Sequence, residues 1–225
     1  MEGLVSVIIP TYNRWKNLLI AVESVKAQTY KNVEIIVVND CSTQKEYYEN
    51  MLEDVIVLNL PENLRKKHNV TAAQGMTRNH GLRIAKGEWI AFLDDDDAWL
   101  PTKLETQLKV LKEHDAKFSS TNAYSGYGLY LPAKKYVSRY FPDPPNLLKF
   151  YKKSDIQNVN LIMNSSVIIH KSVVTGVGEF ELGDVEDWKY WLSALERIPH
   201  CIYITTPLIY YDMGHGSGKN YKYNC

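Results

Sequence analysis

The sequence predicts an α/β protein with a mostly parallel central sheet, helices on both faces and a smaller C-terminal extension. In the first half of the chain, short apolar runs rich in β-branched residues alternate with longer segments of helical periodicity. This alternation is typical of parallel strands joined by helical crossovers. Three of the apolar runs end in polar clusters, at residues 10–12, 39–40 and 94–97. Because such sheets bind ligands at the carboxyl ends of their strands, we expect the three clusters to form one site.

The elements of the first half follow from the spacing of apolar residues. Continuous apolar runs predict strands that are covered on both faces, and apolar residues at helical spacing predict the helices between them. Lys86-Gly87 is a suitable stop for one of these helices. The predicted strands are residues 4–9, 33–38, 55–58 and 89–93, and the predicted helices are residues 15–25, 43–52, 69–85 and 101–114.

The second half of the chain has a different composition. After about residue 122, tyrosines become frequent and prolines occupy positions 132, 142, 144 and 145. We expect an irregular or antiparallel extension that is integrated with the first half, so that residues 1–122 and 123–225 form two halves of one domain. A strand is predicted to start at residues 117–120, another at residues 165–169 and one or two more within residues 201–211, and a helix is expected to begin at residue 184 or 185.

Composition excludes several classes of protein. The 225 residues are 45% hydrophobic, which is ample for a folded core, and 26 basic residues balance 26 acidic ones. This balance gives no overall field that favours nucleic acid or an anionic membrane, so any anion site must be local. Three cysteines lack the spacing of a zinc site or a disulfide scaffold, and neither a signal peptide nor a membrane-spanning helix is expected. We expect a cytoplasmic protein, with peripheral attachment to a membrane left open.

Four consecutive aspartates, residues 94–97, follow the fourth predicted strand. Carboxylates this close disfavour one another's ionised form unless a cation joins them, and their oxygens suit a hard cation such as Mg²⁺ or Mn²⁺. A solvated acidic turn is the simpler alternative. A calcium loop of the EF-hand type is excluded, because the sixth position of that loop requires glycine and is Trp99 in this chain.

Five motifs occur in order at residues 5–14, 34–42, 75–81, 92–104 and 186–188. Together they resemble the family 2 glycosyltransferases of the GT-A fold. The first four cover residues 5–104 almost continuously, and their shared order is a stronger signal than any single motif.

The resemblance implies a site for a nucleotide-sugar donor. Asp40 would accept a hydrogen bond from the base, which favours uracil because its imino N–H is a donor. Arg78 would lie near the diphosphate, since guanidinium binds phosphate through paired hydrogen bonds, and glycine would permit close approach. Taken singly, these residues also fit a strand-ending turn, a helix cap and an exposed helix face, and the basic residues 65–67 are interpreted as solvated surface. The residues assigned to the donor are Pro10, Thr11, Tyr12, Arg14, Asp40, Gly75, Arg78, Asp94 and Asp95.

The resemblance also implies a divalent metal ion, Mn²⁺ or Mg²⁺, held at an Asp-x-Asp motif. Asp96 is assigned as the main metal ligand and His215 as a second one, although four adjacent aspartates leave the register open by one residue. Asp97 is expected to cap the turn into the following helix.

Asp187 is assigned as the general base by resemblance, with Glu186 in a supporting role. The alternative is that both acids merely favour the positive end of a helix. An aspartate of ordinary pKa is a poor base for a hydroxyl group, so burial or the neighbouring glutamate must raise its pKa.

The predicted function is therefore that of an inverting hexosyl- or N-acetylhexosaminyltransferase. It would transfer a sugar from a nucleotide diphosphate donor, UDP-linked by preference, to a hydroxyl of a glycan, lipid-linked or protein acceptor. Residues 1–122 would bind the donor, and residues 123–225 would bind the acceptor and supply the base. Two alternatives are a sugar nucleotidyltransferase, which residues 186–188 and the lack of a glycine-rich, lysine-containing N-terminal loop disfavour, and a noncatalytic binding module. No nucleic-acid partner is expected.

Overall fold

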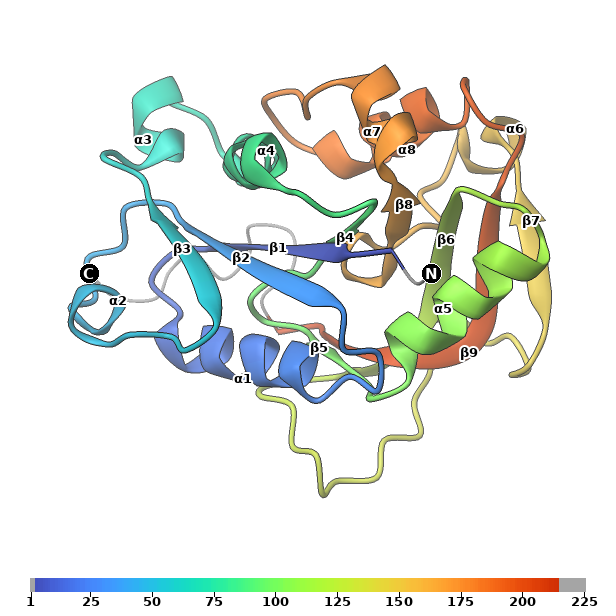
Figure 1. Ribbon diagram of the computed structural model, residues 1–225, viewed down its shortest axis with the longest axis horizontal. Helices are drawn as coiled ribbons and strands as arrows, with labels where there is room; N and C mark the ends of the chain where they lie inside the picture. The colour runs from blue at the N-terminus through green and yellow to red at the C-terminus, as the bar shows by residue number, and fades with distance from the viewer. Residues whose placement is uncertain (1–2, 215–225) are drawn as a thin grey trace.

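The computed structural model describes residues 3–214, and in them strands and helices alternate as the apolar pattern predicts (Figure 1). The strands are β1 (Val5–Thr11), β2 (Val33–Asn39), β3 (Val55–Asn59), β4 (Trp89–Phe92), β5 (Ala98–Trp99), β6 (Phe118–Gly126), β7 (Leu148–Tyr151), β8 (Ile168–His170) and β9 (Cys201–Asp212). The helices are α1 (Trp15–Lys26), α2 (Glu46–Glu49), α3 (Leu64–His68), α4 (Gln74–Ile84), α5 (Lys103–Glu113), α6 (Lys153–Ile156), the 3₁₀ helix η1 (Asn164–Ser166), α7 (Lys171–Val177) and α8 (Glu186–Ala194).

One sheet runs through both halves of the chain. Its strand order is β3-β2-β1-β4-β8-β6-β9-β5, and β7 pairs with β9. Strands β1 to β4 pair in parallel, as predicted. In the rest of the sheet β4–β8, β6–β8, β5–β9 and β7–β9 are antiparallel, and β6–β9 is parallel. The parallel sheet predicted from the first half therefore continues as a mixed sheet, which agrees with the antiparallel extension expected from the change in composition.

Helices cover both faces of the sheet because successive side chains of a strand point to opposite sides. Val7 of β1 packs in a core with Leu18 and Val22 of α1, whereas its neighbour Ile8 packs in a second core with residues of α4, α7 and α8. In Figure 1, α1 lies on one side of β1 and β2, and α4 lies on the other.

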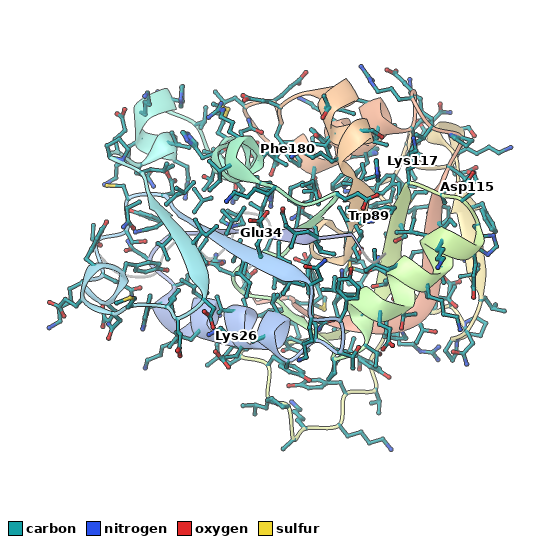
Figure 2. The ribbon with its side chains drawn as sticks, in the orientation of Figure 1. Lys26, Glu34, Trp89, Asp115, Lys117 and Phe180 are labelled. Atoms are coloured by element: carbon teal, nitrogen blue, oxygen red, sulfur yellow. The ribbon has the colours of Figure 1, made fainter. Side chains whose placement is uncertain are left out.

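The core beside α4 contains a group of aromatic rings. Phe180, labelled near α4 in Figure 2, stacks on Tyr190 with ring centroids 3.9 Å apart and meets Phe92 edge-on at 5.3 Å. Because Phe180 lies just before α8 and Phe92 ends β4, these contacts anchor the start of α8 against the carboxyl end of the parallel strands.

The segment between β3 and β4 differs from the prediction. A single helix was expected over residues 69–85. The helix that forms there, α4, begins only at Gln74, and an additional short helix, α3, precedes the predicted range. Asn69 ends α3 with a positive φ of 52°, a left-handed conformation that asparagine tolerates better than most residues. The predicted helix at residues 43–52 is reduced to the single turn α2.

Within residues 3–214, no helix has the length and apolar character that crossing a lipid bilayer requires.

Candidate active site

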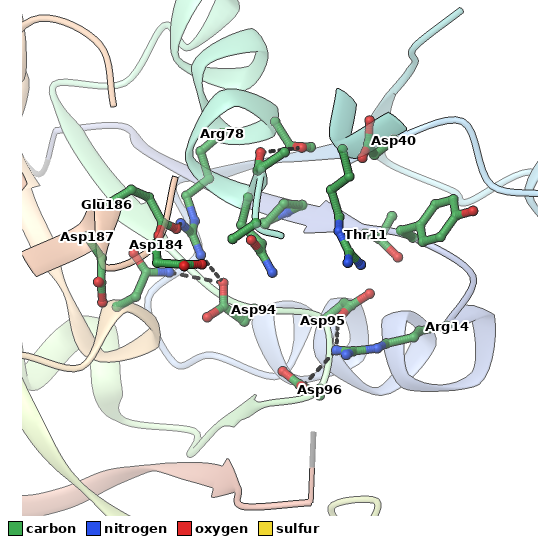
Figure 3. Close-up of a pocket in the computed structure, with 18 of the residues that line it drawn as sticks. Thr11, Arg14, Asp40, Arg78, Asp94, Asp95, Asp96, Asp184, Glu186 and Asp187 are labelled. Carbon is green, nitrogen blue, oxygen red and sulfur yellow. Dashed lines mark hydrogen bonds and ion pairs between the residues drawn. The ribbon is translucent and has the colours of Figure 1, made fainter. Parts of the chain in front are cut away.

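The polar clusters at the strand ends meet as predicted. Thr11 at the end of β1 is the register partner of Asn39 at the end of β2, and the acidic residues 94–96 follow β4. Thr11, Asp40 and residues 94–96 line a cavity of about 630 Å³ that reaches from Asp40 on one side to Glu186 and Asp187 on the other (Figure 3). Ligand sites of small molecules are commonly this large.

Arg14 binds one end of the acidic run. Its Nη1 donates to Asp95 Oδ1 at 3.0 Å and to Asp96 Oδ2 at 2.8 Å, as the dashed lines of Figure 3 show. The Arg14 side chain is 20% exposed. Charge-assisted hydrogen bonds of this kind neutralise part of the repulsion among the carboxylates.

Arg78 binds the other end and connects the acidic run to α8. It donates to Asp94 Oδ1 at 2.6 Å and to Glu186 Oε1 at 2.8 Å, and its side chain is only 3% exposed. The two carboxylates hold the pKa of the guanidinium above its usual range, against the opposing effect of burial. Arg78 therefore fixes the position of Glu186 relative to the strand-end carboxylates.

Asp187 lies beside Glu186 at the start of α8. One oxygen accepts a hydrogen bond from the backbone N–H of Trp188 at 2.7 Å, and the other accepts a long one from Asn160 Nδ2 at 3.4 Å. Burial, reinforced by the charge of Glu186 and opposed by Arg78, raises the pKa of the Asp187 carboxyl to about 6. A carboxylate with this pKa is a better proton acceptor than an exposed aspartate.

A second cavity, of about 180 Å³, adjoins the first. Four residues line both cavities: Asp94, Asn164, Asp187 and Tyr211. The second cavity is otherwise walled by Tyr140, Asn160, Ile162, Met163 and Ser165, most of which come from the segment between β7 and β8.

Two side chains that the sequence did not single out position Asp94. Asn164 Nδ2 donates to Asp94 Oδ1 at 3.0 Å, and Ser165 Oγ accepts from the Asp94 backbone N–H at 3.0 Å. Both belong to η1, whose residues 164–166 carry no pattern that marks a functional site. Their importance follows only from the pairing of β8 with β4, which places them against the acidic run.

Asp40 lines the cavity, and its carboxylate also accepts hydrogen bonds from neighbouring groups of the protein. Its Oδ1 accepts from the Leu64 backbone N–H at 2.8 Å, and its Oδ2 accepts from Asn63 Nδ2 at 2.9 Å. Burial, opposed by the Leu64 hydrogen bond and by Arg65, raises the pKa of Asp40 to about 6. Since each carboxylate oxygen has two lone pairs, Asp40 retains the capacity to accept one more hydrogen bond.

The basic residues 65–67 were interpreted as solvated surface, and for Arg65 this is wrong because its side chain lines the large cavity. Arg65 lies just beyond the carboxyl end of β3, on α3. The other polar clusters were assigned to the site because they follow the carboxyl end of a predicted strand, and the same criterion would have assigned Arg65 to it.

Two further assignments need correction. Asp97 does not cap α5; it is buried, and its Oδ1 accepts from the Asp212 backbone N–H at 2.9 Å, so it fastens the end of β9 to the acidic run. Gly75 does not line the large cavity. A Cβ at this position would lie 2.6 Å from Glu186 Cγ and 2.8 Å from Phe180 Cβ, so glycine is needed there for the approach of α4 to the start of α8.

The chemistry of the acidic run fits a hard divalent cation. Asp94, Asp95 and Asp96 all line the cavity, and Asp96 has a pKa raised to about 7 by burial and by the charges of Asp95 and Asp94, with Arg14 opposing. A cation would relieve this repulsion. Among residues 3–214, no group of three or more His, Cys, Asp or Glu side chains converges as a metal site. The coordination of a cation at the acidic run would therefore need ligands in addition to these carboxylates. His215, the second predicted ligand, lies outside the described residues.

The remaining residues assigned to the nucleotide-sugar donor lie at the carboxyl end of a strand, as predicted. Pro10, Thr11 and Tyr12 line the cavity at the end of β1, next to Arg14 and opposite α8. Every assigned site residue in residues 3–214 except Gly75 therefore borders the same cavity.

Comparisons with known proteins agree with this geometry. Residues 6–170 match the model of glycosyl transferase family 2. The chain is 33% identical over 200 residues to the UDP-Glc:alpha-D-GlcNAc-diphosphoundecaprenol beta-1,3-glucosyltransferase WfaP of Escherichia coli, a match that covers 86% of this chain and 71% of WfaP. An uncharacterized glycosyltransferase of Rickettsia felis is 33% identical over 202 residues, which are 87% of this chain but 32% of that protein.

The fold is shared with a solved glycosyltransferase structure. The crystal structure of the 1–349 fragment of S. aureus TarS with UDP-GlcNAc superposes with a TM-score of 0.72 at 21% identity, covering 98% of this chain and 61% of that one. The chain thus spans less than two thirds of the TarS fragment and about a third of the Rickettsia protein. The predicted GT-A fold class is confirmed, as is the prediction of a glycosyltransferase. On the match over residues 6–170 and the identity to WfaP, the chain belongs to glycosyl transferase family 2.

Proposed function

We propose that the protein is an inverting glycosyltransferase in which Asp187 is the general base. The observation that carries the proposal is the position of Asp187, which lines both the large cavity and the small one. A base in this position can contact an acceptor hydroxyl in one cavity while the donor sugar lies in the other. Its pKa of about 6 keeps it ionised at neutral pH while leaving it more basic than an exposed aspartate.

The reaction is a single displacement. The acceptor hydroxyl oxygen attacks the anomeric carbon of the donor sugar, the bond from that carbon to the diphosphate oxygen breaks, and the hydroxyl proton passes to a carboxylate oxygen of Asp187. The electron pair of the broken bond leaves with the nucleotide diphosphate. Glu186 holds Asp187 in a region of negative charge, and Arg78 fixes Glu186 through its hydrogen bond at 2.8 Å.

The large cavity is the donor site in this proposal. Tyr12 and Asp40, on the side of the cavity away from α8, would bind the nucleotide base. Arg65 and Arg78 border the space between that nucleotide base and the acidic run. A uridine donor is supported by the names of two similar proteins, since WfaP is described as using UDP-Glc and TarS was crystallised with UDP-GlcNAc. We therefore assign a UDP-hexose or UDP-N-acetylhexosamine donor.

Asp96, together with Asp94, would hold Mg²⁺ or Mn²⁺. Such an ion, when bound, neutralises negative charge on the diphosphate leaving group. Arg14 donates a hydrogen bond to one oxygen of Asp96 at 2.8 Å, so Arg14 and a cation would compete for that carboxylate.

The small cavity is the entrance for the acceptor. It is bordered by the amide groups of Asn160 and Asn164 and by the rings of Tyr140 and Tyr211, a combination that suits the hydroxyls and apolar faces of a sugar. WfaP is described as acting on a lipid-linked GlcNAc diphosphate. We assign a lipid-linked sugar as the acceptor class, with the protein acting at the surface of a membrane.

The proposal is tested with purified protein, Mn²⁺ and a panel of UDP-, dTDP- and GDP-sugars, by assaying UDP and pyrophosphate release separately. We expect slow UDP release by hydrolysis of one UDP-sugar and faster release when a GlcNAc-bearing acceptor is added. Asp187→Asn should reduce transfer by about 10²–10⁴-fold, the usual contribution of a general base, while UDP binding stays within twofold of the parent. Release of pyrophosphate, or undiminished transfer by Asp187→Asn, would contradict the assignment.

A further inference from the structure

A long loop between β6 and β7, residues 127–141, projects from the body of the protein. In Figure 1 it extends at the bottom of the view, beyond α1 and β9. Its apolar side chains point outward: Tyr127 is 76% exposed, Leu131 56% and Val137 71%. Leu129 is 42% exposed. We call residues 127–141 the projecting loop.

The exposure of these apolar residues does not come from a lack of structure in the loop. Tyr130 and Tyr136 stack on each other and pack on Tyr210 of β9, with centroids 4.7–5.6 Å apart. The Tyr210 hydroxyl donates to the Gly128 carbonyl at 2.8 Å, and the Tyr136 hydroxyl accepts from the Leu131 backbone N–H at 2.9 Å. Tyr130 and Tyr136 thus form the inner side of the loop, and Leu129 and Leu131 are exposed on its outer side.

The loop is also basic, in a chain that is neutral overall. Lys134, Lys135 and Arg139 lie in it, and no acidic residue occurs from residue 116 to residue 142. Lys134 and Lys135 are exposed at the turn between Leu131 and Val137. Exposed leucine, valine and tyrosine interleaved with lysine is the composition of a surface that enters the headgroup region of a bilayer, because the apolar groups insert while the ammonium groups meet lipid phosphates.

The far end of the projecting loop leads to the small cavity. Tyr140 lines that cavity, and its ring meets Tyr211 edge-on at 5.1 Å. Tyr211 lines both cavities and so connects this end of the loop to the surroundings of Asp187. A substrate anchored in a membrane beneath the loop would therefore arrive on the side where the small cavity lies.

We propose that the projecting loop docks the protein on an anionic lipid bilayer. This inference rests on the proposed function for its purpose, which is to bring a lipid-linked acceptor to Asp187, but it makes a separate physical claim. The occupant is a membrane and not an acidic protein, because four apolar side chains surround the two lysines of the turn. It is not a second copy of the chain, because the loop is uniformly basic and two such loops would repel each other.

The test is flotation of the full chain with vesicles of phosphatidylcholine alone or mixed with phosphatidylglycerol. We expect binding to the anionic vesicles only, weakened by salt. Leu129→Ser with Leu131→Ser should lower the partition coefficient about tenfold, from the apolar area no longer inserted. Lys134→Gln with Lys135→Gln should lower it about fivefold per lysine. Met51→Ser is the matched control, because Met51 is 93% exposed outside the loop and should have no effect.

Several outcomes would overturn the inference: equal binding by the loop variants and the parent, equal binding to neutral and anionic vesicles, or an effect of Met51→Ser as large as that of the leucine pair. Self-association that depends on Leu129 and Leu131 would assign the loop to a second copy. UDP release from the donor alone, measured without vesicles, separates the two proposals. Loop variants should retain it in full, and a protein that binds vesicles but releases no UDP would contradict the proposed function and leave the docking surface standing.

Discussion

Arg14 and Arg78 each bind two carboxylates of the same cavity, but they do so in different surroundings. Arg14 connects Asp95 and Asp96, which are adjacent in the chain, and its side chain is 20% exposed. Arg78 connects Asp94 to Glu186, which lie in different halves of the chain, and it is 3% exposed. A partly solvated ion pair can exchange partners at low cost, whereas a buried one cannot lose a partner without leaving a charge stranded. The Arg14 end is therefore the adjustable side of the site, and the Arg78 end is its framework.

The largest effect expected from this comparison is on stability. Arg78→Ala would leave Asp94 and Glu186 without their cation and should lower the free energy of unfolding by about 3 kcal/mol or more. Arg14→Ala, in a more solvated position, should lower it by about 1 kcal/mol. Urea unfolding of both variants measures the difference. Equal losses would mean that the two arginines are equivalent and that Arg78 is not a special link between the halves.

The second effect concerns the cation. Asp96→Ala should raise the Mn²⁺ concentration needed for the thermal shift by UDP at least about tenfold. Removing a group that only orients a metal ligand already lowers metal affinity by about this much. Asp184→Ala is the control, because Asp184 is another carboxylate of the same cavity that bonds Thr71 and lies outside the acidic run. If both variants give the same metal titration as the parent, Asp96 is not the ligand.

Much of this comparison was predictable from the sequence, and part was not. The parallel strands and their polar ends follow from local apolar patterns, so the meeting of Thr11, Asp40 and the acidic run could be predicted. The Arg78–Glu186 pair joins residues 108 positions apart, and no local pattern encodes it. Asn164 and Ser165 were missed for the same reason, since the antiparallel return of β8 places them beside Asp94.

The third effect is on the pH dependence of the reaction. As the proposed general base, Asp187 could accept a proton only when it is ionised, and burial raises its pKa to about 6. The rate at saturating donor and acceptor should therefore be constant above about pH 7 and fall about tenfold per pH unit below pH 6, since protonation removes the base. The residual rate of Asp187→Asn should lack this acidic limb. If the limb persists in Asp187→Asn, another group controls it.

The smallest expected effect tests how closely the framework is packed. Gly75→Ala would normally stabilise a helix by about 1 kcal/mol. At this position, however, the new methyl group would lie 2.6 Å from Glu186 Cγ and 2.8 Å from Phe180 Cβ. Neither atom is the end of a flexible side chain, so α4 and the start of α8 must separate. We expect a net loss of about 1 kcal/mol in the free energy of unfolding, from overpacking of about 1–3 kcal/mol less the gain in helix propensity.

Gly176→Ala supplies the matched comparison, because Gly176 is also helical but faces only the Arg197 side chain, at 3.3 Å from its Cδ. That side chain can move, so Gly176→Ala should be neutral or stabilising. The maximal rate and UDP binding of Gly75→Ala then show whether this packing also controls activity. If the framework positions Asp187 through Glu186 and Arg78, separating α4 from α8 lowers the maximal rate more than it lowers UDP binding, because the proposed site of the uracil base is at Tyr12 and Asp40, on the far side of the cavity from α8. A variant that loses stability but keeps its maximal rate would show that the start of α8 tolerates displacement, and that the Arg78 end is a fold contact without control over the base.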